Sequence, residues 1–456
     1  MIKVITYGTY DHLHYGHIRL LERAKMLGDY LIVGITSEDF DKQRGKINVQ
    51  QTLEERVAAV RATGLADKII IEEYEGQKID DIKKYGIDIF TVGSDWEGKF
   101  DYLSEYCKVI YLPRTQGVSS TEIRDKKNSI RFGLVGYASY LNRVFKECQF
   151  VNGVKITSLC AESTVDLNQD LLSVSVVTSE YDKFLSTVDA VYIHSNPDKH
   201  YEEVKKAIEA GKHVMCESPI AESKEQCEEL IRLAESRRVV LMDSLRTAYS
   251  TAYARMLLLI KGGKIGDVVS IDATCTSLST NSISDELSNM KWSSMTAWGP
   301  TAMLPIFQIL GTEYKNISIT SKCEEERTMD VFSEISFRYP KAVATVKVGS
   351  GVKSEGELII SGTKGYIYVP APWWKTDYFE IRYENPADNK RYFYQLDGEG
   401  IRYEWVAFIK MINVMNKQDN DSVDTEKYID NIDRKVSIQT CEVVGDFITG
   451  KDVFYI

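Results

Sequence analysis

Residues 6–17 read Thr6-Tyr7-Gly8-Thr9-Tyr10-Asp11-His12-Leu13-His14-Tyr15-Gly16-His17, and this stretch decides the fold of the first part of the chain. An apolar run over residues 2–5 enters it, and apolar residues at helical spacing follow over residues 18–27. A strand, a tight turn that contains glycine, and a helix whose first turn holds His17 are therefore predicted. This order is typical of a parallel α/β sheet.

The predicted turn has the chemistry of a phosphate-binding site. A helix N-terminus presents free backbone N–H groups and a partial positive charge, and both attract phosphate. His14 and His17, three residues apart, add donors at the same end of the helix. Gly8 and Gly16 let the backbone come close to a ligand. The alternative is an ordinary strand-to-helix turn with surface histidines.

Length, charge and cysteine content limit the class of protein. A chain of 456 residues is too long for one ordinary core, so two or three domains are expected. A net charge of −11 argues against general nucleic-acid binding but leaves room for a local basic pocket. The eight cysteines form no Cys-x-x-Cys pair, which favours free thiols in a reducing cytosol over disulfides or a metal site.

Nothing in the sequence predicts export or membrane insertion. Met1 leads directly into the first predicted strand, so no signal peptide is expected. No apolar run approaches the length of a transmembrane helix. We therefore expect a cytoplasmic protein that acts on small molecules, without a nucleic-acid partner and without membrane insertion.

The first 127 residues resemble a known family. Residues 8–11 and 14–17 match the GTFD and HxGH motifs of the nucleotidyltransferase superfamily, and the stretches 95–101 and 114–121 narrow the match to the cytidylyl branch. Residues 1–127 are thus similar to glycerol-3-phosphate cytidylyltransferases over their whole length. The resemblance implies transfer from CTP to a polyol phosphate, with glycerol 3-phosphate as the leading acceptor, for teichoic-acid-like or capsular polymers. An adenylyltransferase is the less favoured alternative.

The resemblance also implies the site residues. Catalytic roles fall to His14, His17, Lys46 and Arg114, and acceptor binding to Arg56 and Tyr74. Mg²⁺ is expected with CTP because the cation offsets the repulsion between anions. Capping boxes are predicted at Thr52 with Glu55 and at Ser119 with Glu122. The nucleotide-binding set implied by the family comprises Gly8, Thr9, Tyr10, Asp11, Gly16, Asp95, Thr115, Ser119, Ser120 and Thr121.

Two departures from the family fall on the acceptor side. Gly64 stands where the family commonly has an arginine before the acid that matches Asp67, and Arg61 lies one turn earlier. Tyr74 stands where the family usually has tryptophan. These changes put the identity of the acceptor in question more than that of CTP.

The rest of the chain predicts a second nucleotide fold. Residues 130–136 have the pattern of a Rossmann first strand, although Ala138 and Leu141 occupy positions where a dinucleotide fingerprint wants glycine. The stretches 188–197, 210–219, 262–266 and 398–404 resemble the Gfo/Idh/MocA oxidoreductase family. That resemblance implies a Rossmann domain over 130–250, a domain with an open antiparallel sheet over 251–456, and a homodimer formed through the sheet. Implied NAD(P)-binding residues are Gly136, Glu162, Asn196 and Glu217.

The reaction centre of that family is altered in this chain. Ser218 stands where the family has lysine, residues 297–307 lack the family's acid and histidine, and no histidine follows residue 213. Several groups are open as replacement proton donors, and His200 lines either a nicotinamide pocket or the core. The C-terminal part is therefore either a reductase that makes the polyol phosphate or a non-catalytic scaffold. The replacement donors considered are Tyr249, Tyr253, Lys291 and Lys212.

Overall fold

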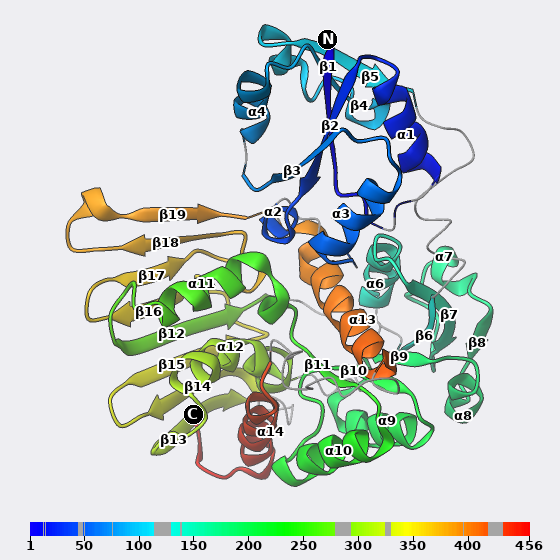
Figure 1. Ribbon diagram of the computed structural model, residues 1–456. Helices are drawn as coiled ribbons and strands as arrows, with labels where there is room; N and C mark the ends of the chain where they lie inside the picture. The colour runs from blue at the N-terminus through cyan, green and yellow to red at the C-terminus, as the bar shows by residue number, and fades with distance from the viewer. Residues whose placement is uncertain are drawn as a thin grey trace. The chain divides into compact units, whose positions relative to one another are not determined.

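The computed structural model describes residues 1–456 except 12, 14, 44–48, 50, 75, 114–128, 137–138, 279–292, 324–329, 395 and 418–431. For residues 15, 42, 43, 95 and 417 it describes the backbone alone. The chain forms two compact units, Met1–Ser129 and Ile130–Ile456 (Figure 1). A further division of the second unit at residue 250 remains an expectation from the sequence.

The first unit contains a five-stranded sheet in the order β3-β2-β1-β4-β5, and all its pairs are parallel. Short apolar runs form these strands, as the sequence predicts for strands covered on both faces. The strands are β1 (Lys3–Gly8), β2 (Tyr30–Thr36), β3 (Lys68–Glu72), β4 (Ile89–Gly93) and β5 (Lys108–Leu112).

Both faces of this sheet carry helices because successive strand residues point to opposite sides. Val4 packs with Leu21 and Val60 in one core, whereas Ile5 packs with Ile82 in a second core. The predicted capping box of Thr52 and Glu55 is present at the start of α3. The helices are α1 (Tyr15–Lys25), α2 (Glu38–Gln43), α3 (Leu53–Ala62) and α4 (Gln77–Tyr85), with the 3₁₀ turns η1 (Ser94–Trp96) and η2 (Asp101–Glu105).

The second unit begins with a parallel six-stranded sheet in the order β11-β10-β9-β6-β7-β8, which confirms the predicted Rossmann-like fold. Its strands are β6 (Ile130–Val135), β7 (Val154–Cys160), β8 (Val176–Thr178), β9 (Ala190–Ile193), β10 (His213–Glu217) and β11 (Leu241–Ser244). Its helices are α6 (Tyr140–Cys148), α7 (Gln169–Leu172), α8 (Tyr181–Leu185), α9 (Pro197–Glu209) and α10 (Lys224–Arg237), followed by η3 (Arg246–Tyr249).

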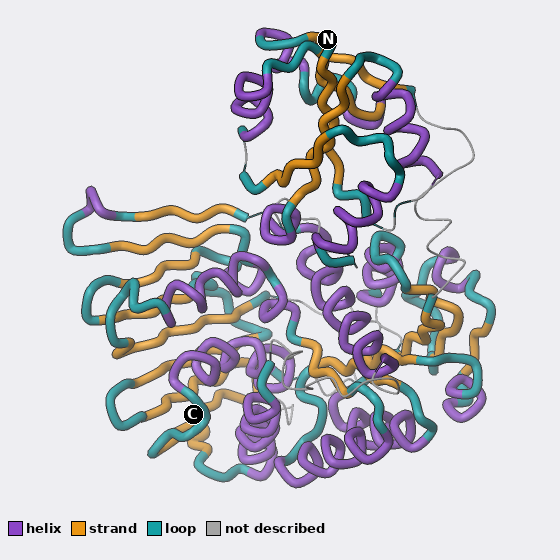
Figure 2. The backbone as a smooth tube through the Cα atoms, viewed as in Figure 1, coloured by secondary structure: helices purple, strands orange, loops and turns teal. Residues whose placement is uncertain are grey.

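The predicted open sheet follows, with nine strands in the order β19-β18-β17-β16-β12-β15-β14-β13-β20 (Figure 2). It is mixed rather than antiparallel as expected, because β12 pairs with β15 and β13 with β20 in parallel. Parallel neighbours need a long crossover, and the chain between β12 and β15 carries a helix and two strands. The strands are β12 (Val268–Thr276), β13 (Asn316–Cys323), β14 (Asp330–Arg338), β15 (Val343–Gly349), β16 (Leu358–Gly362), β17 (Tyr366–Val369), β18 (Tyr378–Arg382), β19 (Lys390–Phe393) and β20 (Val453–Tyr455).

Helices α11 and α12 lie against this sheet. Helix α13 contacts α6 and η3, which belong to the part of the chain that forms the six-stranded sheet. Among the described residues, no helix has the length and apolarity needed to cross a bilayer. The eight cysteines are free thiols. The helices are α11 (Thr251–Lys261), α12 (Ser294–Leu310), α13 (Ile401–Lys417) and α14 (Arg434–Thr449), with η5 (Trp373–Lys375), η6 (Pro386–Asp388) and η7 (Asp397–Gly400).

Candidate active site

The strand order of the first unit reverses between β1 and β4. From β1 the chain adds β2 and β3 on one side and then returns to place β4 and β5 on the other. Open α/β sheets bind ligands outside the carboxyl ends of their strands at such a switch point. Residues 8–11 follow β1, α1 begins at Tyr15, and η1 follows β4. The structure therefore brings the predicted phosphate-binding turn to the switch point.

Tyr10 forms the inner wall of this turn. Its side chain is 1% exposed, its φ of 54° lies in the left-handed region, and burial raises its pKa. The ring centroid lies 5.5 Å from that of His17, edge to face. A Cβ on Gly8 would approach the Tyr10 ring to 2.9 Å. Gly8 thus makes room for the Tyr10 ring, which packs against His17. The sequence had suggested a different role for Gly8, the close approach of the backbone to a ligand.

Gly8→Ala is expected to destabilise the first unit by about 1–3 kcal/mol, because the new methyl group must displace the Tyr10 ring. His17 would shift with that ring, so activity should fall as well. Thermal unfolding and turnover measured on one preparation check both effects. Gly93→Ala is the matched control, since a Cβ there meets nothing within 4 Å. Equal behaviour of the two variants would contradict the packing role of Gly8.

Arg56 lies behind the turn and is fully buried. Its Nη1 donates to the carbonyl oxygens of Thr9 and Thr36, each at 2.9 Å, and its Nε donates to that of Gln51 at 3.3 Å. Nη1 also lies 3.4 Å from Oδ2 of Asp41. The guanidinium therefore ties the turn to the end of β2 and to the chain before α3. Its predicted contact with an acceptor phosphate stays a prediction.

Asp41 and Asp11 complete this network. Asp41 accepts hydrogen bonds from the hydroxyls of Thr36 at 2.7 Å and Thr9 at 3.2 Å. Asp11, also buried, accepts one from the backbone N–H of Gln51 at 3.0 Å. Hydrogen bonds to Asp41, Gln51 and Arg56 thus hold the turn in place. Thr9, Asp11 and Arg56 are among the residues predicted from the sequence, whereas Asp41 was not predicted because it has no recognisable spacing to them.

The other predicted residues of this site divide into two groups. Tyr74 is 48% exposed and donates its hydroxyl to Asp80 on α4 at 2.8 Å. Gly16 lies in the first turn of α1, and the backbone of Asp95 lies in η1. Outside the described residues lie His14, Lys46, Arg114, Thr115, Ser119, Ser120 and Thr121, together with the capping box expected at Ser119 and Glu122.

A buried polar cluster beneath the sheet edge was also missed. The Tyr7 hydroxyl donates to Asp81 on α4 at 2.9 Å, and desolvation raises the pKa of Tyr7. Lys78 pairs with Glu72 at the end of β3, and its Nζ lies 4.7 Å from the Tyr7 ring centroid. In sequence these charges look like an ordinary solvated helix face. Only the packing of α4 against β1 and β3 reveals them.

The second unit gathers polar side chains at the carboxyl edge of its parallel sheet. Glu217 ends β10 and accepts hydrogen bonds from Tyr192 of β9 and from Ser244 of β11, the latter at 3.4 Å. Glu404 of α13 is fully buried and accepts from Ser244 at 2.9 Å. His194 Nδ1 lies 3.9 Å from Glu217 Oε1, and burial lowers the pKa of His194 to about 4, so this imidazole is neutral near pH 7.

Arg246 of η3 supplies a positive charge that acts on both carboxyl groups. Its guanidinium lies 5.1 Å from the ring centroid of Tyr140 on α6. Burial raises the pKa of Glu217 and, more strongly, that of Glu404, while the charge of Arg246 acts in the opposite direction on each. Near the edge where the family has its lysine, the described residues therefore include the carboxyl groups of Glu217, Glu404 and Asp243 and the guanidinium of Arg246.

The predicted dinucleotide residues occupy neighbouring strand ends. Gly136 follows β6 with a φ of 130°, and a Cβ there would lie 2.3 Å from the carbonyl oxygen of His194. Asn196, at the start of α9, is buried. Glu162 is exposed and pairs with Lys199 at 2.8 Å. Gly136, Asn196 and Glu217 thus share one edge, whereas Leu141 fills the core at the third glycine position.

The groups left open by sequence analysis separate in the structure. His200 is fully buried, with ring nitrogens 2.7 Å from the carbonyl oxygen of Pro219 and 3.0 Å from that of Ser195, which gives it a core role. Tyr253 is fully buried and bonded to Gln308. Tyr249 is 6% exposed. Lys291 lies outside the described residues.

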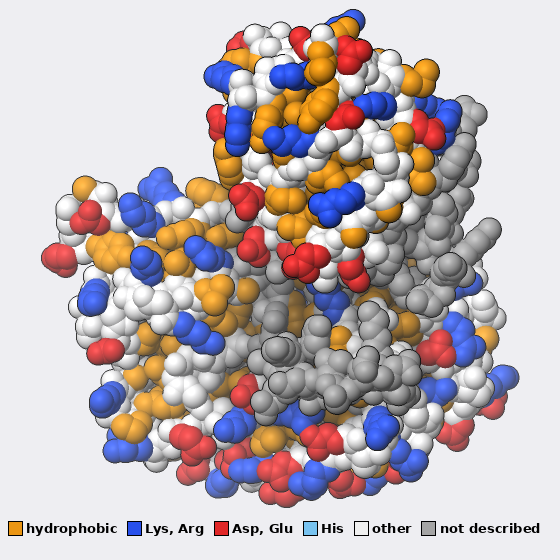
Figure 3. Space-filling model, in the orientation of Figure 1, with side chains coloured by type: hydrophobic (Ala, Val, Ile, Leu, Met, Phe, Trp, Pro, Cys, Tyr) orange, Lys and Arg blue, Asp and Glu red, His pale blue; other side chains and the backbone are white. Residues whose placement is uncertain are grey.

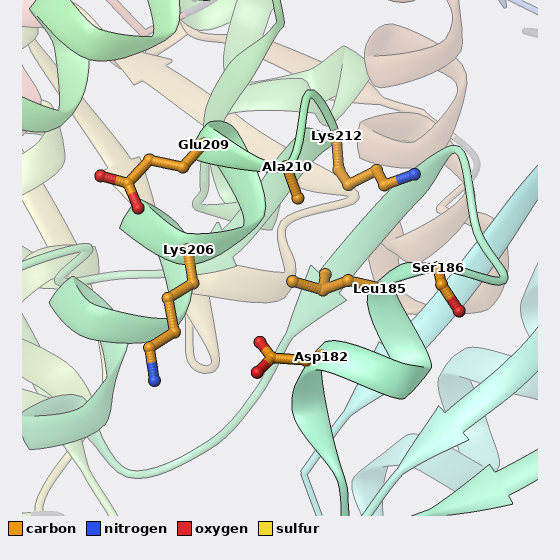
Figure 4. A pocket seen from close by; sticks show the side chains of 7 residues that line it. All are labelled: Asp182, Leu185, Ser186, Lys206, Glu209, Ala210 and Lys212. Carbon is orange, nitrogen blue, oxygen red and sulfur yellow. The ribbon is translucent and has the colours of Figure 1, made fainter.

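Lys212 lies at the other edge of the sheet. It precedes β10, and its Nζ donates to the carbonyl oxygen of Val188 at 2.9 Å. There it borders an open cavity of about 400 Å³ beside α8 and the end of α9, where the Lys206 and Asp182 side chains also project (Figure 4). Lys212 is therefore excluded as a proton donor at the carboxyl edge. The cavity is separate from the Glu217 cluster.

Comparisons with known proteins identify relatives of the first unit. A family model described as cytidylyltransferase-like matches residues 5–126. The glycerol-3-phosphate cytidylyltransferase of Bacillus spizizenii is 52% identical over 130 residues, which are 28% of this chain and 100% of that protein. The enzyme of the same name from Bacillus subtilis is 49% identical over 126 residues, covering 28% of this chain and 97% of that protein.

Relatives of the second unit are more distant. A family model described as an oxidoreductase family with an NAD-binding Rossmann fold matches residues 130–244. A 3-ketoreductase from Actinomadura kijaniata, solved with NADP and TDP-benzene, gives a TM-score of 0.61 at 17% identity, covering 72% of this chain and 100% of that one. An oxidoreductase from Pseudomonas syringae gives 0.58 at 13%, covering 72% and 98%. At these identities the likeness shows the fold alone.

Proposed function

Through its N-terminal unit this chain belongs to the glycerol-3-phosphate cytidylyltransferase family, and from that premise we propose that it converts CTP and a polyol phosphate to a CDP-polyol and pyrophosphate. Glycerol 3-phosphate is the leading acceptor. The observation that carries the proposal is the turn of residues 8–11. Arg56 and Asp41 fix this turn at the switch point between β1 and β4. A helix start and His17 flank that turn.

Charge determines the mechanism. A phosphomonoester is largely dianionic at neutral pH because its second pKa is about 6, so it needs no general base. An acceptor phosphate oxygen bonds to the α-phosphorus of CTP while the bond from that phosphorus to the bridging oxygen breaks, and pyrophosphate leaves with both electrons. Repulsion between the anions sets the barrier, so positioned cations and N–H donors supply the catalysis.

Each catalytic group has a defined task in this scheme. His17 and the first backbone N–H groups of α1 stabilise charge on the transferring phosphoryl group. By family resemblance His14, Lys46 and Arg114 hold the triphosphate. Mg²⁺ bound to CTP would offset the repulsion between the triphosphate and the acceptor phosphate. Among the described residues there is no group of three or more metal-ligating side chains.

Pyrophosphate release with CTP, and none with ATP, is the expected result when the purified full-length protein is mixed with glycerol 3-phosphate and Mg²⁺. Mass spectrometry should then find CDP-glycerol. Ribitol 5-phosphate is the matched second acceptor, because Gly64 and Tyr74 depart from the family on the acceptor side. Faster turnover with ribitol 5-phosphate would make ribitol 5-phosphate the preferred acceptor. Release of pyrophosphate with ATP would contradict the assignment as a cytidylyltransferase.

For the second unit we propose reduction of a phosphorylated aldose or ketose to the polyol phosphate that the first unit activates. The shared edge of Gly136, Asn196 and Glu217 supports an NAD(P) site, since the backbone at Gly136 is closer to β9 than any side chain would allow. A bound cofactor would supply hydride. The alternative, a scaffold without cofactor, is favoured by Ser218 and by Leu141 at the third glycine position; calorimetry with NADPH separates the two.

The nine-stranded sheet supports a proposed homodimer. Its outward-facing positions carry exposed apolar side chains: Val269 on β12, Val343 on β15, Tyr366 on β17 and Phe393 on β19. Figure 3 shows apolar side chains among charged ones beside these strands. Association through the sheet would cover part of this apolar surface. A cytoplasmic location and a role in teichoic-acid-like or capsular polymers complete the proposal.

A further inference from the structure

Ser244 lies between two carboxyl groups in the second unit. Its Oγ is 2.9 Å from Oε2 of Glu404 and 3.4 Å from Oε1 of Glu217. A hydroxyl has one hydrogen to donate, and an ionised carboxylate can only accept. One hydrogen cannot satisfy two carboxylates. If one carboxyl group carries a proton, however, Ser244 accepts from that group and donates to the other, so each contact has a hydrogen, although 3.4 Å is long for a hydrogen bond.

The charge balance of the cluster points the same way. Arg246 is the positive charge that acts on both carboxyl groups, and two ionised glutamates beside the buried carboxyl group of Asp243 would exceed that single charge. Glu404 is fully buried, and its Oε1 has no hydrogen-bond partner among the described residues. The carboxyl group that holds the proton is thus Glu404. Other titratable groups that face the pair are Tyr140 and Cys148 on α6, Tyr192 on β9, His194 after β9, His200 on α9, and Asp243 on β11.

Glu217 is the member of the pair that can exchange a proton with the surroundings. Its side chain is 18% exposed, whereas Glu404 is completely enclosed. Glu217 ends β10 directly before Ser218, the position at which the related oxidoreductases carry lysine, and the Ser218 hydroxyl is buried without a partner among the described residues. A proton that reaches Glu217 therefore arrives at the carboxyl edge where Gly136 and Asn196 also lie.

We propose that Glu217 is the acid–base group of a second active site in this chain, recharged by Glu404 through Ser244, and that it protonates the oxygen of a carbonyl substrate during reduction. The inference rests on the reductase role proposed above. It makes Glu217 the catalytic residue, with Glu404 and Ser244 as positioning residues.

The step balances in atoms and electrons. A bound reduced nicotinamide cofactor would supply the hydride for the new C–H bond at the carbonyl carbon and would itself be oxidised. The proton of Glu404 passes through the Ser244 hydroxyl to Glu217, and the O–H bond so formed on Glu217 breaks as that proton moves to the carbonyl oxygen, which takes up the π electrons of the carbonyl. A phosphorylated ketose thereby becomes a polyol phosphate. A proton from water then restores Glu404 by the reverse route, through Glu217, which is the partly exposed member of the pair, and the Ser244 hydroxyl.

Infrared spectroscopy tests the shared proton without any cofactor. Full-length protein with ¹³C-labelled glutamate should show the stretching band of a protonated glutamic acid at neutral pH, and Glu404→Gln should remove part of it. Glu229→Gln is the control that should leave the band unchanged, because the hydrogen bond from Lys205 lowers the pKa of Glu229 and keeps it ionised at neutral pH. Glu203, outside the pair, contributes to the band on its own account, because burial raises its pKa to about 7. A band that Glu404→Gln and Glu217→Gln both leave unchanged overturns the proposal.

Stability against pH gives a second readout. A carboxyl group whose folded pKa lies above its unfolded pKa stabilises the protein only while it is protonated, so the stability of the wild type falls as pH rises through the folded pKa. The amide introduced by Glu404→Gln does not titrate. Five of the six tryptophans lie in this unit, so tryptophan fluorescence mainly follows its unfolding. We therefore expect the free energy of unfolding measured in this way to fall less with rising pH in Glu404→Gln than in the wild type. If the stability of the wild type and that of Glu404→Gln change equally with pH, the proposed shared proton is contradicted.

Cofactor oxidation tests the donor role. With NADPH or NADH and either dihydroxyacetone phosphate or ribulose 5-phosphate, Glu217→Gln should lower the rate by at least about 100-fold while cofactor binding persists. Ser244→Ala should slow the reaction less and shift its pH profile, and Glu203→Gln should have no effect. A wild-type protein that oxidises neither cofactor removes the reductase role and the donor role together, while the infrared result still decides the shared proton.

Discussion

His17→Ala should lower the turnover of CTP by roughly 10²- to 10³-fold and leave the fold intact. The imidazole lies in the first turn of α1, beside the free N–H groups that face the carboxyl edge of the sheet. Charge grows on the transferring phosphoryl group as pyrophosphate departs, and His17 is placed to donate to it. Its packing contribution is modest, since the side chain is only half-buried and meets Tyr10 edge to face.

The comparison needs a control on the same helix. Arg19→Ala removes an ion pair with Glu22 that lies on the partly exposed face of α1, so turnover should stay near the wild-type value. Pyrophosphate release gives kcat and KM, and circular dichroism checks the fold. Near-normal turnover in His17→Ala would remove His17 from the active site. Equal losses in both variants would point to damage to α1 instead.

The sequence predicted the first strand of each parallel sheet, because each is a short apolar run that leads into a glycine-bearing turn. The apolar run of residues 2–5 overlaps β1, and the strand expected over residues 130–136 corresponds to β6. The capping box at Thr52 was equally accessible, since both of its partners lie within four residues. Local patterns of this kind require no knowledge of the tertiary fold.

Contacts between distant elements could not be predicted in the same way. Arg56 and Asp41 are 15 residues apart and meet only because α2 and α3 both pack at the end of β2. A buried arginine and a surface arginine look alike in sequence. The parallel pairing of β12 with β15 was missed for a related reason, because alternation reveals a half-buried strand but not the direction of its neighbour.

The second reaction centre shows a different limit of sequence reasoning. Ser218 marked the loss of the family's lysine, and the search for a substitute considered lysine and tyrosine because they are common proton donors. Glu217 was assigned to cofactor binding, and Glu404, 187 residues further along the chain, was seen only as part of a family motif. Their connection depends on Ser244, whose hydroxyl reaches both.

Arg56→Met should destabilise the N-terminal unit by about 3–5 kcal/mol, the range found when one partner of a buried ion pair is removed. Methionine fills much of the same volume but donates no hydrogen bonds. The carbonyl oxygens of Thr9 and Thr36 would lose their shared donor, and Asp41 would keep a buried charge without the guanidinium beside it. The turn proposed to hold the triphosphate would loosen, so turnover should fall below the level that unfolding alone explains.

Urea unfolding of the full chain measures this effect, and the transition that CTP shifts to higher urea belongs to the N-terminal unit, because a ligand stabilises only the unit that binds it. Arg61→Met is the matched control: Arg61 is exposed near the end of the same helix, and its loss should cost less than about 0.5 kcal/mol. Arg56→Lys keeps the charge but lacks the planar fork that reaches two carbonyl oxygens, so it should recover part of the stability and little of the turnover. If Arg56→Met and Arg61→Met unfold alike, Arg56 does not hold the turn. If Arg56→Met instead stays stable and raises KM for the acceptor alone, the arginine contacts the acceptor phosphate, as the family resemblance implied.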